Sequence, residues 1–130
     1  MPSPPDLSLA DLKAGLVLHL DPAVLESSGG TYGCAAEQRV QGHHFFLCIE
    51  ASGQTGRWLP VYSGPGIDRT KLPTRGRSGH PKWLNANAYY HVAQVWSAPC
   101  QAVIAAAIAG GDQSTKQKRN TLNTSLLPSL

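Results

Sequence analysis

Two alternating apolar runs constrain the fold most strongly: HHFFLCIE at 43–50 and RWLPVYS at 57–63, joined by the six residues ASGQTG. Side chains alternate between the two faces of a β-strand, so the period-two pattern of each run predicts a strand. Their short, glycine-containing connection predicts an antiparallel hairpin. Pro60 cannot donate a ladder hydrogen bond, which predicts a sheet edge or a bulge at that position.

Two more segments have strand character. GLVLHL at 15–20 alternates leucine with other residues, and YYHVAQVWS at 89–97 is rich in aromatic and β-branched side chains. The residues between 21 and 42 are expected to form a long connection, broken at the glycine pair 29–30. The sequence therefore predicts four or five short strands with irregular connections.

A helix is predicted at 99–109, within APCQAVIAAAIAGG. Pro99 suits its first turn, Ser97 or Ala98 is the expected cap, and two glycines at 110–111 end it. Helical spacing predicts a buried stripe consisting of Val103, Ile104, Ala107 and Ile108.

Short strands followed by one late helix predict a mainly β protein: a small, curled antiparallel sheet with a C-terminal helix against it. An SH3-like β-barrel fits this pattern best, and other small β-barrels are the alternative. The chain has 130 residues, which suits a single domain. We expect this domain at 14–111, with a flexible, proline-rich N-terminus at 1–13 and a polar tail at 112–130.

The charge is concentrated in one part of the chain. The net charge is only +3, but the stretch from Arg57 to Lys82 has six Lys or Arg residues against the single acid Asp68, a local charge of +5. Most of this charge lies in RTKLPTRGRSGHPKW at 69–83, the basic segment, which contains no acidic residue. A focused positive field attracts polyanions, although a solvated surface loop can have the same composition.

Several classes of protein are disfavoured. Three cysteines are an odd number without close spacing, which is a poor disulfide framework. The N-terminus has no signal-peptide pattern, and the longest apolar run, AVIAAAIA, is too short to span a bilayer. We therefore expect a cytoplasmic protein with reduced thiols and no membrane association.

The order GLVLHLDP, GHHFFLCIE, hairpin, LPVYS resembles the MazF/PemK-type toxins over about residues 15–63. The resemblance implies an SH3-like barrel, a homodimer, metal-independent cleavage of single-stranded RNA, and an acidic antitoxin as partner. It matches Ser63 to the family's Ser/Thr position. The chain departs from the family where Gly42, His43 and His44 replace the catalytic arginine, and the region after Ser63 has no counterpart. That region is typical of a distinct, uncharacterised bacterial family.

The residues needed for metal-independent RNA cleavage are present. Histidine suits proton transfer near neutral pH, and arginine holds phosphate with a planar fork of donors. The candidate catalytic residues are His44 and His80 for proton transfer, Arg57 for phosphate, and Ser63 to orient the scissile group. Lys/Arg residues interleaved with an aromatic ring also suit single-stranded nucleic acid. The candidate binding residues are Arg69, Lys71, Arg75, Arg77, Lys82 and Trp83.

Each candidate also has a structural interpretation, since surface histidines and a core or interface tryptophan are common. Three functions therefore remain open: a toxin-type endoribonuclease, a non-catalytic nucleic-acid-binding module, and a protein-interaction module that meets an acidic partner. No metal or cofactor is expected, because adjacent histidines on a strand face opposite ways and no Cys-x-x-Cys or His-x-x-x-His spacing occurs.

Overall fold

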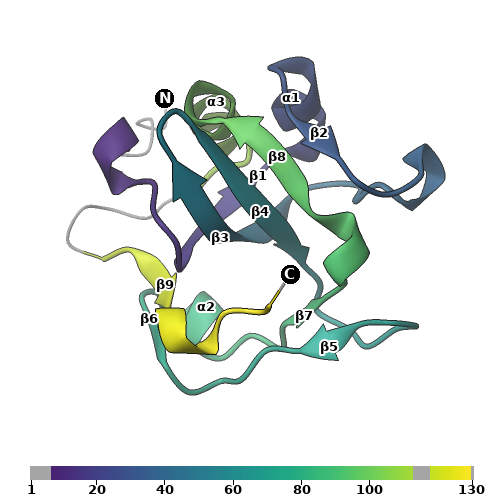
Figure 1. Cartoon of the computed structure of the whole chain (residues 1–130). Coiled ribbons are helices and arrows are strands. Elements are labelled where there is room, and N and C mark those ends of the chain that lie inside the picture. The colour runs from purple at the N-terminus through teal and green to yellow at the C-terminus, as the bar shows by residue number, and fades with distance from the viewer. Residues whose placement is uncertain (1–6, 113–117, 130) are drawn as a thin grey trace.

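A computed structural model describes residues 7–112 and 118–129 (Figure 1). Its main feature is a seven-stranded antiparallel sheet with the strand order β2-β8-β4-β3-β1-β9-β6. These strands are β1 Leu16–Leu20, β2 Thr31–Tyr32, β3 His44–Ser52, β4 Thr55–Val61, β6 Arg77–Ser78, β8 Trp96–Pro99 and β9 Asn120–Leu122. A smaller sheet pairs β5 Thr70–Lys71 with β7 Tyr89–Tyr90.

Short helices complete the described part of the chain. The α-helices are α1 Pro22–Ser27, α2 Pro81–Leu84 and α3 Cys100–Ala109, and the 3-10 turns are η1 Leu9–Asp11, η2 Ala36–Gln38, η3 Val92–Gln94 and η4 Thr124–Leu126. The predicted helix is present as α3, but it is accompanied by α1 and α2. Among these residues, no helix has the length and apolar character that crossing a membrane requires.

The sheet is open. Its edge strands β2 and β6 have two residues each and do not pair with one another. The predicted mainly β fold with an antiparallel sheet is confirmed, whereas the sheet is not a closed barrel, and the SH3-like detail is not confirmed.

The hairpin is formed by β3 and β4, as predicted. Ser52 pairs with Thr55, so the strands extend through most of the expected connection and leave only a tight turn at Gly53, whose φ is +62°. The register shifts between Cys48 and Glu50, which makes Ile49 the extra residue of a β-bulge. Pairing between β4 and β8 ends at Trp58. Pro60 lies beyond that pair, so its lack of an N–H removes no hydrogen bond to β8.

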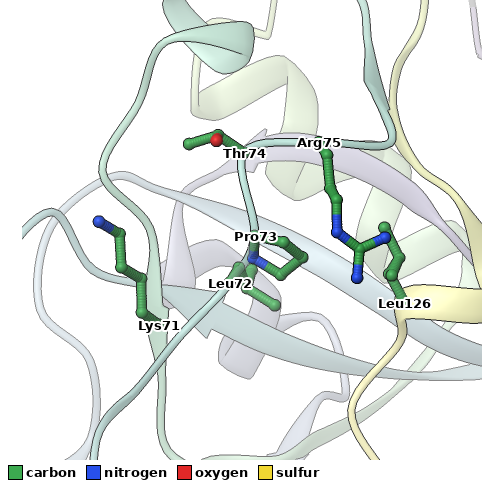
Figure 2. Close-up of a pocket in the computed structure, with 6 residues that line it drawn as sticks. All are labelled: Lys71, Leu72, Pro73, Thr74, Arg75 and Leu126. Carbon is green, nitrogen blue, oxygen red and sulfur yellow. The ribbon is translucent and has the colours of Figure 1, made fainter.

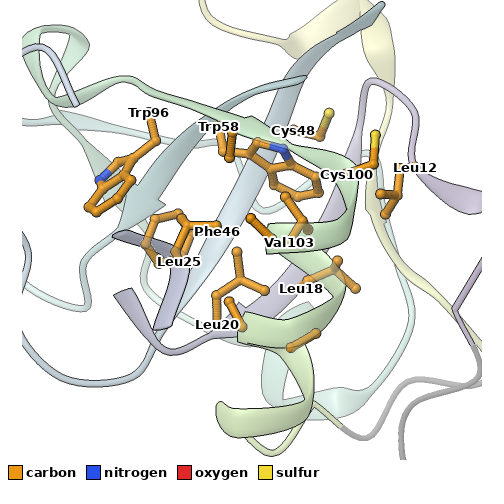
Figure 3. Packing of buried hydrophobic residues seen from close by; sticks show 14 of the residues in the cluster. Leu12, Leu18, Leu20, Leu25, Phe46, Cys48, Trp58, Trp96, Cys100 and Val103 are labelled. Atoms are coloured by element: carbon orange, nitrogen blue, oxygen red, sulfur yellow. The ribbon is translucent and has the colours of Figure 1, made fainter. Parts of the chain in front are cut away.

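One face of the sheet packs against α1 and α3 (Figure 3); we call it the helix-covered face. Its fully buried side chains include Leu18, Leu20, Leu25, Phe46, Trp58 and Trp96. The α3 stripe differs from the prediction, because Ile108 is 51% exposed and the small Cys100, Ala102 and Ala106 are buried instead. Small side chains allow the backbone of α3 to approach the sheet closely: the N–H of Asp21 donates to the carbonyl of Ala106 at 3.0 Å.

The opposite face packs against irregular chain; we call it the loop-covered face. Its core comprises Val17, Leu47, Val61, Leu72, Trp83, Ala88 and Leu122. The sheet is therefore buried on both sides, which explains why successive residues of β1 and β3 are apolar. Phe46 and Cys48, on the strand face opposite Phe45 and Leu47, are accordingly fully buried.

The predicted strand at 89–97 is interrupted. Tyr89 and Tyr90 form β7, η3 turns the chain, and β8 resumes at Trp96. His91 causes the interruption by capping η3, since its Nδ1 accepts a hydrogen bond from the N–H of Ala93 at 3.1 Å.

Described residues of the expected N-terminal and tail segments pack against the sheet. Residues 1–6 and 113–117, on which parts of both predictions fall, lie outside the described residues. Leu12 is buried in the core, and β9 inserts between β1 and β6 within the expected tail. The buried Leu122 accounts for this insertion, because it adds an apolar side chain to the loop-covered face.

Candidate nucleic-acid interface

The basic segment runs through β5, a turn, β6 and α2, along the loop-covered face (Figure 1). Gly76 allows the turn: its φ is +75°, and a Cβ there would lie 2.4 Å from the side chain of Leu126. α2 begins at Pro81, whose ring suits the first helical position. The basic segment therefore has defined secondary structure and covers one face of the sheet.

Arg77 is used inside the protein. Its Nε donates to the carbonyl of Pro73 at 2.9 Å, and its Nη1 donates to the carbonyls of Trp83 and Ala86, each at 2.8 Å. Its guanidinium carbon lies 4.4 Å from the centre of the Trp83 ring, and burial lowers its pKa below the usual value of arginine. These contacts tie the turn to α2, so the predicted phosphate-binding role does not suit Arg77.

Trp83 is likewise structural. It is 0% exposed, and its Nε1 donates to the carbonyl of Thr121 at 2.9 Å. The ring also packs edge-on against Phe45 with 5.8 Å between the ring centroids. A ring that solvent cannot reach offers no surface to a nucleic-acid base, so the burial of Trp83 does not support the predicted base stacking.

Arg69 is engaged at the start of the segment. Its guanidinium carbon lies 3.8 Å from the centre of the Tyr62 ring, and its Nη1 donates to the carbonyl of Gly64 at 3.1 Å. Burial raises the pKa of Tyr62, and the charge of Arg69 opposes that rise. Arg69 therefore fixes the chain after β4 while its charge stays near the surface.

The remaining three cations of the segment face solvent. Lys71, Arg75 and Lys82 are exposed, and none of them takes part in an ion pair within residues 7–112 and 118–129. Lys71 and Arg75 extend on either side of Pro73 at the rim of an open hollow of about 640 Å³ (Figure 2). The hollow is lined by Lys71, Leu72, Pro73, Thr74, Arg75 and Leu126. Lys71 and Arg75 could contact phosphate oxygens, while Leu72, Pro73 and Leu126 make the rest of the lining largely apolar.

His44 is held by the backbone. Its Nδ1 lies 3.2 Å from the carbonyl oxygen of Val61, and its Nε2 lies 3.0 Å from that of Gln41. Its ring also packs edge-on against Tyr62. Both ring nitrogens face backbone carbonyl oxygens, and a neutral ring donates to one of the two.

The other predicted catalytic residues do not meet at one place. His80 caps α2, its Nδ1 accepting from the N–H of Lys82 at 3.1 Å. Arg57 pairs with Glu50 at 3.0 Å beside the hairpin turn. Ser63 is exposed and follows the opposite end of β4, about 13 Å or more from Arg57 at 3.3 Å per strand residue. The structure brings only His44 near the Ser63 end, and the four residues form no catalytic cluster.

One cluster of titratable residues was not predicted from the sequence. The Nε2 of His43 lies 3.4 Å from one carboxylate oxygen of Asp21, whose other oxygen caps α1 by accepting from the N–H of Ala23. The His43 ring meets the His19 ring edge-on, and the Nδ1 of His19 lies 2.6 Å from the carbonyl oxygen of Gly110. The Asp-Pro pair at 21–22 was a helix-start signal that could have placed Asp21. Every contact of this cluster links β1, α1, β3 and the end of α3, which suits a structural role.

Within the described ranges, no group of three or more His, Cys, Asp or Glu residues is arranged to hold a metal ion. Comparison of the chain with models of known families, with curated proteins and with solved structures finds no match.

Proposed function

We propose that the protein is a non-catalytic module that binds single-stranded RNA through Lys71, Arg75 and Lys82. The observation that carries the proposal is that these three exposed cations, free of ion pairs with described acids, lie on one segment that contains no acidic residue. Cations already engaged by carboxylates must give up those contacts to bind phosphate, whereas these three need not.

The fixed geometry of the segment supports this proposal. Arg77 ties Pro73 to α2, so Arg75 and Lys82 belong to elements joined by hydrogen bonds. A preorganised cluster loses less conformational entropy on binding than a flexible basic tail does. Salt-dependent binding through a few phosphate contacts is therefore expected.

Binding without cleavage agrees better with the site than endoribonuclease activity does. Metal-independent cleavage needs a proton acceptor and a proton donor beside the same phosphate. Both nitrogens of His44 face backbone carbonyls, and His80 caps α2. Arg57 and Ser63 lie at opposite ends of β4, so they cannot bind the same phosphate together beside either histidine.

The test is binding of a fluorescent single-stranded RNA, measured by anisotropy at several salt concentrations. Three phosphate contacts predict a slope of log K against log salt of about −2 for single strands. Replacing Lys71, Arg75 and Lys82 by Gln should abolish most of that slope. The matched control replaces Lys13, Arg57 and Lys118 by Gln, which removes the same charges from elsewhere, and should bind like the wild type.

Three results would contradict the proposal. Equal losses in both triple variants would mean that general charge, and not this segment, attracts the RNA. Cleavage of the RNA, seen on a gel and lost in His44→Ala, would favour the toxin-type enzyme. Binding of polyglutamate through the same three cations, without RNA binding, would favour an acidic protein partner.

A further inference from the structure

Ile67 is the most exposed of the large apolar side chains in the described residues. It is 91% exposed, whereas Leu9, Val92 and Ile108 are 49–51% exposed. It lies in the loop of residues 63–69, which leads from the end of β4 to β5 and projects beside the small sheet (Figure 1). Burial of apolar surface is favourable, so contact with a ligand that covers Ile67 would stabilise the complex.

The loop holds this side chain away from the protein surface. The N–H of Arg69 donates to the carbonyl of Gly66 at 3.1 Å, closing a turn whose two central residues are Ile67 and Asp68. The Arg69 guanidinium then returns to the carbonyl of Gly64 and stacks on Tyr62. These contacts hold the turn in place, with Ile67 pointing into solvent.

Asp68 adds to this arrangement. Its φ of +61° is unfavourable for a residue with a side chain and is the only positive φ outside glycine in the described chain. Its carboxylate lies 4.0 Å from the Nε2 of His91, which borders η3. The loop thus adopts a turn that leaves Ile67 in solvent.

The position of Ile67 relative to the exposed cations suggests its ligand. Lys71 follows it by four residues, which span at most about 14 Å of chain. Stacked nucleotides of one strand are about 3.4 Å apart, so Ile67 and Lys71 lie within about four nucleotides of each other. An apolar side chain beside phosphate-binding cations matches the wedges that some proteins insert between bases.

We propose that Ile67 inserts between neighbouring bases of the RNA strand whose phosphates Lys71 and Arg75 bind. This inference rests on the proposed function and adds a substrate preference to it. An aliphatic side chain makes no hydrogen bonds to base edges, so the preference follows from stacking strength. Pyrimidine-rich strands, whose bases are separated at lower cost than stacked purines, should bind more tightly than purine-rich strands.

The test uses an RNA of mostly uridine with one central 2-aminopurine, whose fluorescence rises when it is unstacked from its neighbours. Binding of the wild type should increase this fluorescence. In Ile67→Ser the increase should be lost and affinity should fall about ten-fold, with the salt slope unchanged because the phosphate contacts remain. Ile67→Leu should restore both effects. Leu9→Ser, a change at another exposed apolar residue, serves as the control and should behave like the wild type.

The outcomes separate this inference from the proposed function. If Ile67→Ser binds and unstacks the probe as the wild type does, the wedge is wrong while the salt slope still supports RNA binding. If the wild type binds no RNA, both proposals fail. Vesicles of phosphatidylserine and phosphatidylcholine test the competing ligand class: binding that depends on Ile67, with RNA binding independent of it, would assign the loop to a lipid surface.

Discussion

The two faces of the seven-stranded sheet are both buried, but by covers of different kinds. The helix-covered face lies beneath α1 and α3, and the backbone hydrogen bonds of those helices are mostly internal. The loop-covered face lies beneath the basic segment and the chain around β9, whose irregular backbone leaves carbonyls that need donors from elsewhere.

The difference explains the role of Arg77 in the loop cover. Arg77 donates to the carbonyls of Pro73 and Ala86, which lie outside helices and strands, and adds a donor to the carbonyl of Trp83, which also accepts from the N–H of Ala86 at 3.3 Å. The side chains that α3 buries are apolar or cysteine, because its backbone needs no such help. Irregular chain can therefore cover a sheet when a long side chain such as Arg77 supplies N–H donors to its backbone carbonyls.

The largest expected effects come from the two buried tryptophans. Trp58 fills the helix-covered face and Trp83 the loop-covered face, and both are 1% exposed or less. Replacing either by Ala should lower the free energy of unfolding by about 3–5 kcal/mol, measured by urea denaturation. A loss below about 1 kcal/mol for Trp83→Ala would show that the loop-covered face is not a true core.

The next effect tests the donor role of Arg77. Arg77→Met keeps much of the side-chain volume but removes the guanidinium donors of the half-buried Pro73 and Ala86 carbonyls, at a cost of about 1–3 kcal/mol for each group left unsatisfied. We expect a total loss of about 2–4 kcal/mol in urea denaturation. Arg57→Met is the matched control, since its exposed pair with Glu50 is worth less than about 1 kcal/mol. Equal losses in the two variants would contradict a special role for Arg77.

A smaller effect tests the helix-covered face through pH. Burial raises the pKa of the Cys48 thiol from 9.0 to about 12. Between these values the unfolded chain releases a proton that the folded chain keeps, so stability should fall as pH rises above about 9, by at most about 1.4 kcal/mol per pH unit. Urea denaturation from pH 7 to 10.5 measures the decline, and Cys48→Ala should make it shallower. Parallel declines in the two proteins would mean that Cys48 does not contribute.

The helix-covered face was the more predictable of the two. Period-two runs gave the hairpin, and the proline and glycine signals placed α3 within one residue of its start. Both depend on residues that are close in sequence. The stripe of α3 was less accurate, because Ile108 looks buried by helical spacing while the structure buries Ala106. Close approach of α3 to the sheet, which decides between them, is a tertiary property.

The loop-covered face could not be predicted in the same way. Composition identified the basic segment, but not which of its cations would be exposed. Trp83 is buried because Thr121 and its neighbours, 38 residues later in the chain, pack beside it. Arg77 is drawn into the structure by stacking on the Trp83 ring. No local pattern records such a contact. Trp83 and Arg77 have internal contacts that do not suit the predicted site, while Lys71, Arg75 and Lys82 remain candidates.

The position of β9 has a consequence for the order of folding. Its residue Thr121 pairs with Leu16 of β1, across more than a hundred residues, whereas Ser52 and Thr55 of the hairpin are three residues apart. Closing a long loop has a larger entropic cost and slows the contacts that depend on it. The hairpin can therefore form early, and β9 can dock only after β1 is in place. We therefore expect the segment that carries the exposed cations to acquire its native shape late in folding, once Leu122 and Thr121 complete the surface that Trp83 contacts.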